Sequence, residues 1–229
     1  MIDNIDLKPV IGSICTSLAK PEKANYDRKA KLYERLVGKS WFNRIVWNTL
    51  PKNYTRFARE ALLEKTGSLI DIGCGGLSQT ASLYLSTSNN CILFDRSIGM
   101  LKLAEERLIH GRKKIPPNVT LVQGDAFKLP FREESFDLLC SFGTLHLFDD
   151  KQGFIDSILR VLKPKGYFYL TVMTNKYLNS RLFMNFFKLF GEFGEVCTEK
   201  ELLALFDSDK FIVDSYMSGS VLFIKGQKR

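Results

Sequence analysis

The 229-residue sequence has few of the features that mark secreted, metal-binding or membrane-spanning proteins. Its five cysteines lie far apart and include no CxxC pair, which fits neither a disulfide framework nor a zinc site and favours a reducing compartment. No apolar run approaches the roughly 18 residues that a membrane span needs, and the first ten residues contain no apolar leader. We therefore expect a cytoplasmic protein with no transmembrane segment and no bound metal.

An excess of basic residues is the main bias in composition. Thirty-three Lys and Arg against 25 Asp and Glu give a formal charge of +8. A basic surface attracts polyanions at long range, so a nucleic-acid partner is possible. Short basic clusters are more often solvated surface, however, and no RNA-binding module is recognisable, so a nucleic-acid partner is not favoured.

From Ser68 onward, short apolar runs alternate with amphipathic helical segments. This pattern is typical of a parallel sheet with helices on both faces. Strands are predicted at residues 68–72, 91–95, 119–124, 136–142 and 166–173. Helices are predicted at residues 78–87, 97–110, 151–162, 179–190 and 198–207. The segments FIVDSYM and VLFIKG, on either side of Gly219, predict an antiparallel hairpin at one edge, which completes a seven-stranded α/β sheet.

The first 66 residues have a different pattern. Tyr26, Ala30, Tyr33 and Val37 recur near helical spacing, and RFAREALLEK repeats the pattern. We expect an N-terminal helical lid over residues 1–66 and an α/β core over residues 67–229.

The most informative string is LIDIGCGG, residues 69–76, in which an apolar strand runs directly into closely spaced glycines. Glycines at such a turn let the main chain approach a nucleotide-like ligand. Asp95 follows Gly75 by twenty residues, at the end of the next strand, where a carboxylate can accept hydrogen bonds from ribose hydroxyls. The third glycine of a dinucleotide-binding GxGxxG motif would fall on Ser78, which disfavours NAD. Asp71 suits a cationic ligand better than a pyrophosphate, and the amino group and sulfonium of S-adenosylmethionine are cations.

Five segments in order resemble the motifs of class I S-adenosylmethionine-dependent methyltransferases, in the broad group similar to quinone-biosynthesis methyltransferases. They are DIGCGG, ILFDRSIGMLKLA (92–104), VQGDAFKLPF (122–131), FDLLCSFGTLHLF (136–148) and ILRVLKPKGYFYLTV (158–172). The resemblance covers about residues 26–173 and implies a Rossmann-like fold. Leu77 departs from it, because the family usually has a further glycine there.

The resemblance also implies which residues bind S-adenosylmethionine. Asp71 would act on its amino group, Asp95 on the ribose hydroxyls and Asp125 on the adenine amino group. The other implied cofactor-binding residues are Tyr26, Tyr33, Gly73, Cys74, Gly75, Arg96, Met100, Ala126, Ser141 and Phe142.

The acceptor is less constrained than the cofactor. The aromatic segment NSRLFMNFFKLFGEFGE favours a small molecule with an aromatic or apolar portion. An RNA or protein acceptor is an alternative suggested by the charge, although CSFGTLHL lacks the paired prolines common in enzymes that methylate base amines. A non-catalytic cofactor-binding homologue is a third possibility. His146 is a candidate base or substrate contact, or else an ordinary packed histidine.

Overall fold

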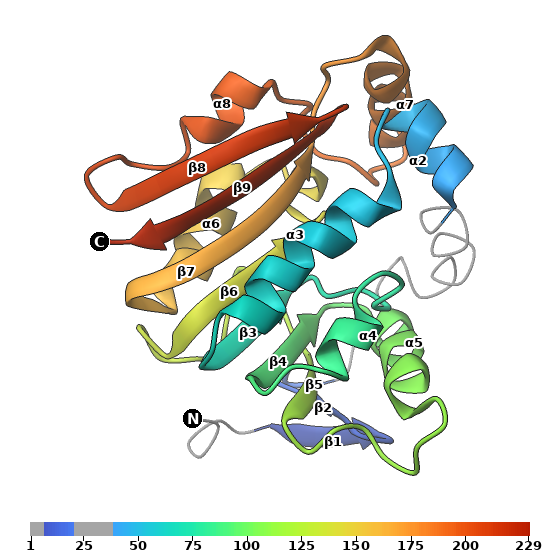
Figure 1. The fold of residues 1–229 in the computed structure, drawn as a ribbon, viewed down its shortest axis with the longest axis vertical. Helices are drawn as coiled ribbons and strands as arrows, with labels where there is room; N and C mark the ends of the chain where they lie inside the picture. Colours follow the sequence, from blue (N-terminus) through green and yellow to red (C-terminus); the bar gives the residue numbers. More distant parts are fainter. Residues whose placement is uncertain (1–6, 21–38) are drawn as a thin grey trace.

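The computed structural model describes residues 7–20 and 39–229, and its centre is a mostly parallel sheet (Figure 1). The strand order across this part of the chain is β1-β2-β5-β4-β3-β6-β7-β9-β8. Five parallel strands form the middle: β3 (Ser68–Ile72), β4 (Asn90–Asp95), β5 (Val119–Gln123), β6 (Phe136–Phe142) and β7 (Leu162–Met173). The antiparallel pair β8 (Phe211–Ser218) and β9 (Val221–Lys228) closes one edge against β7. The predicted parallel strands and C-terminal hairpin are confirmed.

The described residues form nine strands, and the prediction of seven strands was wrong. The additional strands are β1 (Lys8–Ile11) and β2 (Ile14–Thr16), so the helical prediction for this stretch was also wrong. β2 runs parallel to β5 and buries Ile14 completely. Pairing with the otherwise open edge of β5 satisfies the backbone of this short segment, a tertiary effect that helical spacing does not report. The β-branched residues in PVIGSICT were the available signal.

Helices cover both faces of the sheet, as predicted. Two of them, α2 (Ser40–Val46) and α3 (Pro51–Glu64), lie within the first 66 residues and confirm the helical prediction there over their own lengths. The others are α4 (Ala81–Tyr84), α5 (Ile98–Ile109), α6 (Lys151–Arg160), α7 (Leu178–Lys188) and α8 (Glu199–Leu203), with a 3₁₀ turn, η2 (Leu145–Leu147). No helix in the described part of the chain is long and apolar enough to cross a membrane.

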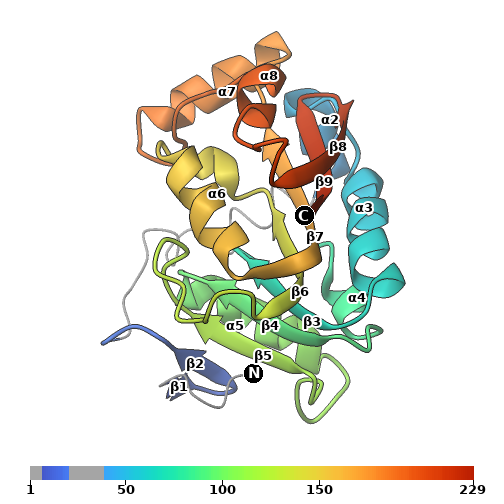
Figure 2. The same ribbon diagram turned by 90° about the vertical axis from the view of Figure 1, so that its left-hand side faces the viewer.

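Two apolar clusters hold the layers together. One cluster joins α3, α4 and α5 to one face of the sheet, and the other joins α6 and α8 to the opposite face. Figure 2 shows α3 and α6 on opposite sides of the strands. The strands in the middle are buried on both faces, which is why they are continuous apolar runs in the sequence.

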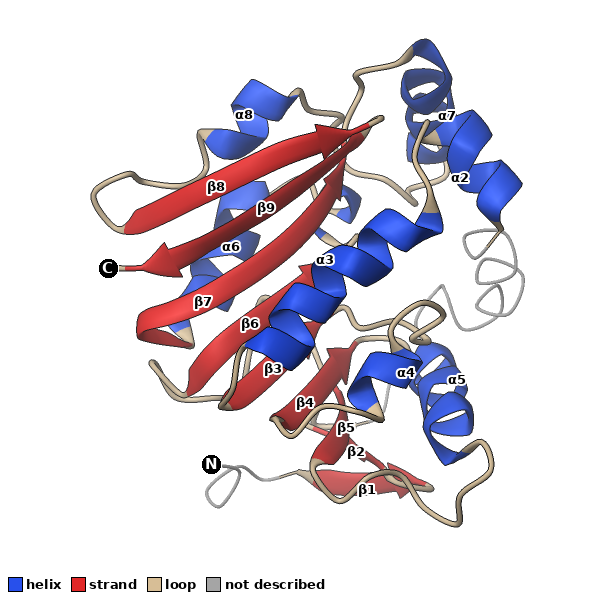
Figure 3. Ribbon diagram, viewed as in Figure 1, coloured by secondary structure: helices blue, strands red, loops and turns tan. Residues whose placement is uncertain are grey.

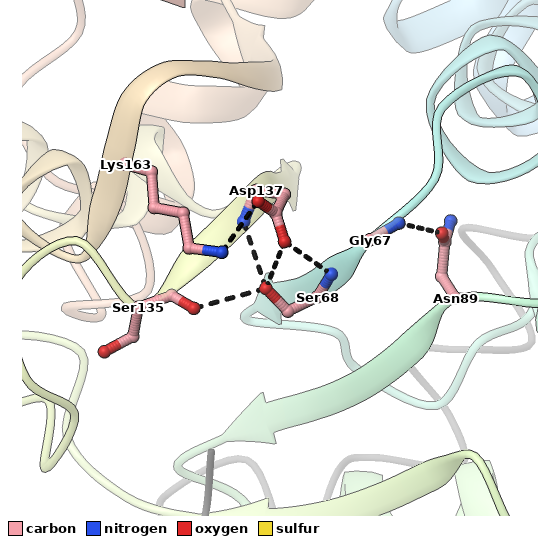
Figure 4. Close-up of polar contacts among 6 residues, drawn as sticks. All are labelled: Gly67, Ser68, Asn89, Ser135, Asp137 and Lys163. Atoms are coloured by element: carbon pink, nitrogen blue, oxygen red, sulfur yellow. Dashed lines mark hydrogen bonds and ion pairs between the residues drawn. The ribbon is translucent and has the colours of Figure 1, made fainter.

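A polar network joins β3 and β6 at their amino-terminal ends (Figure 4). Ser68 donates to Asp137 from its backbone N–H at 2.9 Å and from its hydroxyl at 2.6 Å. The Lys163 ammonium donates to the other oxygen of this carboxylate at 2.7 Å. Partial burial raises the pKa of Asp137, but the hydrogen bonds from Lys163 and Ser68 outweigh it and lower the pKa to about 2. The ionised form therefore stabilises the junction.

We expect Asp137→Asn to lower the free energy of unfolding at pH 7 by about 1 kcal/mol, a value kept small because the side chain is partly solvated. A depressed carboxyl pKa contributes stability above about pH 4 that is lost as the pH falls toward 2. Thermal unfolding followed by circular dichroism should show that the difference in free energy of unfolding between the variant and the unmodified protein becomes smaller over that pH range. Asp214→Asn, at a more exposed ion pair, is the control. An equal loss of stability in both variants at pH 7 would contradict the stabilising role of ionised Asp137.

Candidate functional site

The glycine loop lies where the strand order of the sheet reverses. β3 stands between β4 and β6, and all three strands run in the same direction, so their carboxyl ends share one edge. In open α/β sheets ligands bind outside the carboxyl ends of the strands at this reversal. Figure 3 shows the loop after β3 at this edge, between the ends of β4 and β6. The fold therefore places residues 73–77 at the expected ligand position.

Backbone contacts fix the start of the loop. The N–H groups of Gly73 and Cys74 both donate to the carbonyl of Phe94, at 2.8 and 3.2 Å. Gly73 has a φ of +71°, and a Cβ built there would lie 2.1 Å from the Thr144 hydroxyl oxygen. Glycine is thus required at position 73 by both conformation and space.

Position 77 has a backbone conformation usual for glycine, although leucine occupies it. Leu77 has a φ of +60° while its side chain is 2% exposed in the core. The guanidinium of Arg107 donates to the adjacent carbonyl of Gly76. Burial of the leucine offsets a conformation that disfavours side chains.

Asp95 is brought directly against the glycine loop. One carboxylate oxygen accepts from the Gly75 N–H at 2.9 Å, and the other accepts from the Ser97 N–H at 2.8 Å. An ionised carboxylate only accepts hydrogen bonds, which suits this group to the hydroxyls of a ligand. The twenty-residue spacing therefore corresponds to a real juxtaposition of loop and carboxylate.

Asp71 lies below the loop, 1% exposed, one residue before the end of β3. The Tyr84 hydroxyl donates to one of its oxygens at 2.7 Å, and the other oxygen has no hydrogen-bond partner among the described residues. Burial raises the pKa of Asp71 to about 7, against the opposing hydrogen bond from Tyr84 and with a further increase from the charge of Asp95. This carboxyl is thus poised to ionise near neutral pH. Tyr84, which orients it, was missed because the sequence shows it only as one apolar position of a helix.

The candidate adenine-binding residues follow β4 and β5. The Asp125 carboxylate accepts from the Phe127 N–H at 3.0 Å and lies 3.9 Å from the Arg96 guanidinium. The Ala126 carbonyl accepts from the Ser157 hydroxyl at 2.7 Å. Met100 is buried in the first turn of α5, which Ser97 caps by accepting from the Met100 N–H. The ion pair links the ends of two neighbouring strands beside Asp95.

Ser141 and Phe142 end β6 on the other side of the loop. The buried Ser141 hydroxyl donates to the Ile72 carbonyl at 2.7 Å, and Thr144 lies over Gly73. Ser141 thereby fixes the distance between the ends of β3 and β6, while Phe142 is half-buried. The other two candidates, Tyr26 and Tyr33, lie outside the described residues.

His146 is 1% exposed in η2, with its ring 5.1 Å from that of Phe193. Neither ring nitrogen has a hydrogen-bond partner among the described residues. Burial, and then the charge of Lys151, lower the pKa of His146 to about 3. The imidazole is therefore neutral at pH 7 and a weak proton acceptor.

Comparisons with known proteins show similarity in sequence and in fold. Residues 70–170 match the model of a family described as a methyltransferase domain. This part of the chain is similar to that domain, and the match covers less than half of the 229 residues. The matched residues include the glycine loop, Asp95, Asp125 and His146, and the Rossmann-like fold is similar to that of solved S-adenosylmethionine-dependent methyltransferases.

Among sequence relatives, the ubiquinone/menaquinone biosynthesis C-methyltransferase UbiE of Pseudomonas fluorescens is 31% identical over 150 residues, which are 64% of this chain. The match spans 58% of that relative's length. Among solved structures, a Thermotoga maritima protein described as a methyltransferase, possibly acting on histamine, has a TM-score of 0.63 at 20% identity, over 89% of this chain and 98% of its own. The [4+2]-cyclase SpnF has a TM-score of 0.68 at 16% identity, over 89% and 93%. The cyclase illustrates that this fold alone does not specify methyl transfer.

Proposed function

We propose that the protein transfers a methyl group from S-adenosylmethionine to a small-molecule acceptor with an aromatic or apolar portion. The observation that carries the proposal is the Asp95 carboxylate held against the Gly75 N–H at the strand-order reversal. The methyltransferase domain match and the UbiE relatives support the reaction class.

The residues of the site fit this cofactor chemically. S-adenosylmethionine presents hydrogen-bond donors at its amino group, its ribose hydroxyls and its adenine amino group. Three carboxylates stand on the three adjacent strands β3, β4 and β5 or just after them: Asp71, Asp95 and Asp125. We assign them to those three donors in that order. The remaining contacts are proposed for Tyr26, Tyr33, Gly73, Cys74, Gly75, Arg96, Met100, Ala126, Ser141 and Phe142.

The bound cofactor would supply an already activated methyl group, so the chain's task is to align the acceptor and exclude water. A general base is not required for such a displacement. His146, with a pKa of about 3, would be a poor one at pH 7. We therefore assign His146 to shaping the acceptor side of the site through its contact with Phe193.

An aromatic cluster favours an apolar acceptor. The Phe183 ring lies 5.4 Å from Trp47, 4.5 Å from Phe187 and 6.1 Å from Phe193, and Phe193 contacts His146. These rings connect α2 and α7 to η2, which follows the carboxyl end of β6. Flat, apolar molecules pack well against aromatic faces. We favour a quinone-like aromatic ring as the acceptor, since the relative UbiE is named as a C-methyltransferase of ubiquinone and menaquinone biosynthesis.

Calorimetry with S-adenosylmethionine tests the cofactor assignment first. We expect saturable one-site binding, and an absence of binding would end the proposal. Transfer of a labelled methyl group is then measured with a hydroxylated aromatic, a prenylated quinol and RNA in parallel. Methylation of the aromatic acceptors supports the proposal, and methylation of RNA alone overturns the acceptor class. If the protein binds S-adenosylmethionine but transfers no labelled methyl group in cell extract, it is a non-catalytic homologue.

The affinity for S-adenosylmethionine should rise with pH. A cationic amino group near Asp71 favours the ionised carboxylate, and the pKa of Asp71 is about 7. Between pH 5.5 and 7 we expect about a tenfold increase in affinity by linkage. Tyr84→Phe removes the hydrogen bond that lowers this pKa and should move the rise to higher pH. Calorimetry over this range is the measurement. Asp71→Asn is the control, because the pH dependence of its affinity reflects only the amino group of the ligand. Equal pH dependence of the affinity in the unmodified protein and in Asp71→Asn would refute the linkage to Asp71.

A further inference from the structure

Helix α7 is apolar on its outer side as well as its inner side. Met184 is fully buried, and Phe183 and Phe187 pack against the core. The outward side chains are 56% to 83% exposed: Leu178, Leu182, Phe186, Leu189 and Phe190. A helix of a water-soluble domain ordinarily has charged and polar residues on that side. Among residues 7–20 and 39–229, no segment covers this apolar outer face of α7.

The exposed apolar surface continues onto α2. Trp41 and Ile45, one helical turn apart, are 56% and 57% exposed. The two helices are held together by the Phe42 and Phe183 rings, 5.5 Å apart, and by an Asn179 amide donating to the Ile45 carbonyl at 3.1 Å. Figures 1 and 3 show α2 and α7 side by side at one end of the molecule. We call the set the α2–α7 patch: Trp41, Ile45, Tyr177, Leu178, Leu182, Phe186, Leu189 and Phe190.

All charged side chains of these two segments are cationic. Residues 39–48 and 176–190 contain five Lys or Arg and no Asp or Glu: Lys39, Arg44, Lys176, Arg181 and Lys188. Lys188 forms an ion pair with Glu195, whereas Arg44 lines a pocket between the segments. That pocket is also lined by Asn48, Asn179 and Tyr177. Hydrogen-bond donors beside an arginine suit a phosphate-bearing group.

We propose that the α2–α7 patch docks on a membrane surface that carries anionic lipids. Leu, Phe and Trp on a helix face bordered by Lys and Arg are the composition of helices that lie in the membrane interface. Anionic headgroups complement the cations, and the acyl boundary receives the apolar side chains. A second copy is disfavoured as the occupant, because a twofold interface would set the same cations against one another.

The position of the patch relates the docking to the candidate active site. α7 follows β7, whose carboxyl end shares the sheet edge of the glycine loop. A membrane at the patch would therefore lie beside the edge where the acceptor is expected. This consequence rests on the proposed function and narrows the acceptor to a molecule that resides in the lipid surface.

Co-sedimentation of the full chain with vesicles tests the docking without cofactor or acceptor. Vesicles of phosphatidylcholine alone are compared with vesicles containing phosphatidylglycerol. We expect binding to the anionic vesicles and at least tenfold weaker binding for Leu182→Ser with Phe186→Ser. Arg44→Gln should weaken it about fivefold, the effect of one cation near such a surface. High salt should weaken binding of the unmodified chain.

Ile212→Ser is the matched apolar control, because Ile212 is 54% exposed on β8 against 59% for Leu182. Lys102→Gln on α5 is the charge control. Each control should bind as the unmodified chain does. Absence of binding to anionic vesicles, or equal losses in patch and control variants, would overturn the proposal. So would a dimer in light scattering that the patch variants dissociate while vesicles are not bound. S-adenosylmethionine binding, measured on the same variants, reports the cofactor site separately.

Discussion

Asp95→Ala is expected to weaken S-adenosylmethionine binding about 100-fold or more. Two ribose hydroxyls donating to one carboxylate are charge-assisted hydrogen bonds, each worth about 1.5–3 kcal/mol. The substitution also removes the acceptor of the Gly75 and Ser97 N–H groups, so only the bonds from Gly73 and Cys74 to the Phe94 carbonyl still join the loop to β4. Calorimetry measures the affinity, and far-ultraviolet circular dichroism verifies that the variant is folded.

Asp95→Asn separates charge from shape, because the amide keeps one acceptor oxygen at nearly the same volume. We expect an affinity between those of the unmodified protein and Asp95→Ala. Asp214→Ala, on an exposed strand of the hairpin, is the surface control and should leave binding unchanged. If Asp95→Ala binds S-adenosylmethionine as tightly as the unmodified protein does, Asp95 does not bind the ribose, and the proposed function loses its main support.

Gly73→Ala should lower the free energy of unfolding by about 2–4 kcal/mol and abolish measurable cofactor binding. One part is conformational, because a φ of +71° costs about 1 kcal/mol for a residue with a Cβ. The other part is steric, because the Cβ would lie 2.1 Å from the Thr144 hydroxyl oxygen, and overpacking costs about 1–3 kcal/mol. Chemical denaturation gives the total.

Two further variants divide that total. Gly191→Ala has a similar φ, +68°, but its Cβ would meet nothing within 4 Å, so it measures the conformational part alone. Thr144→Ala in the Gly73→Ala background should recover most of the steric part by removing the atoms in the way. If Gly73→Ala is no more destabilising than Gly191→Ala, the close approach of the two chain segments is not what makes glycine necessary.

Much of the site could be predicted because its parts are local in sequence or regularly spaced. LIDIG gives the strand and the turn, and Asp95 falls one strand–helix–strand unit later, so the topology alone brings its carboxylate to the same edge. The hydrogen bond from the Gly75 N–H to Asp95 shows that residues twenty positions apart in the sequence are in contact. The environments of Asp71 and His146 could not be predicted, because Tyr84 and Phe193 reach them from other elements.

The sequence by itself determined the alternation of buried strands and amphipathic helices, the C-terminal hairpin and the glycine loop, since each depends on local periodicity and backbone preference. Tertiary structure alone decided that residues 8–16 join the sheet as strands and that Thr144 limits position 73 to glycine. It also decided that Leu77 adopts a conformation usual for glycine and that no described segment covers the apolar outer side of α7. Each of these depends on which distant segment, if any, supplies a hydrogen-bond partner or fills the adjacent space, and that information does not lie within a local stretch of chain.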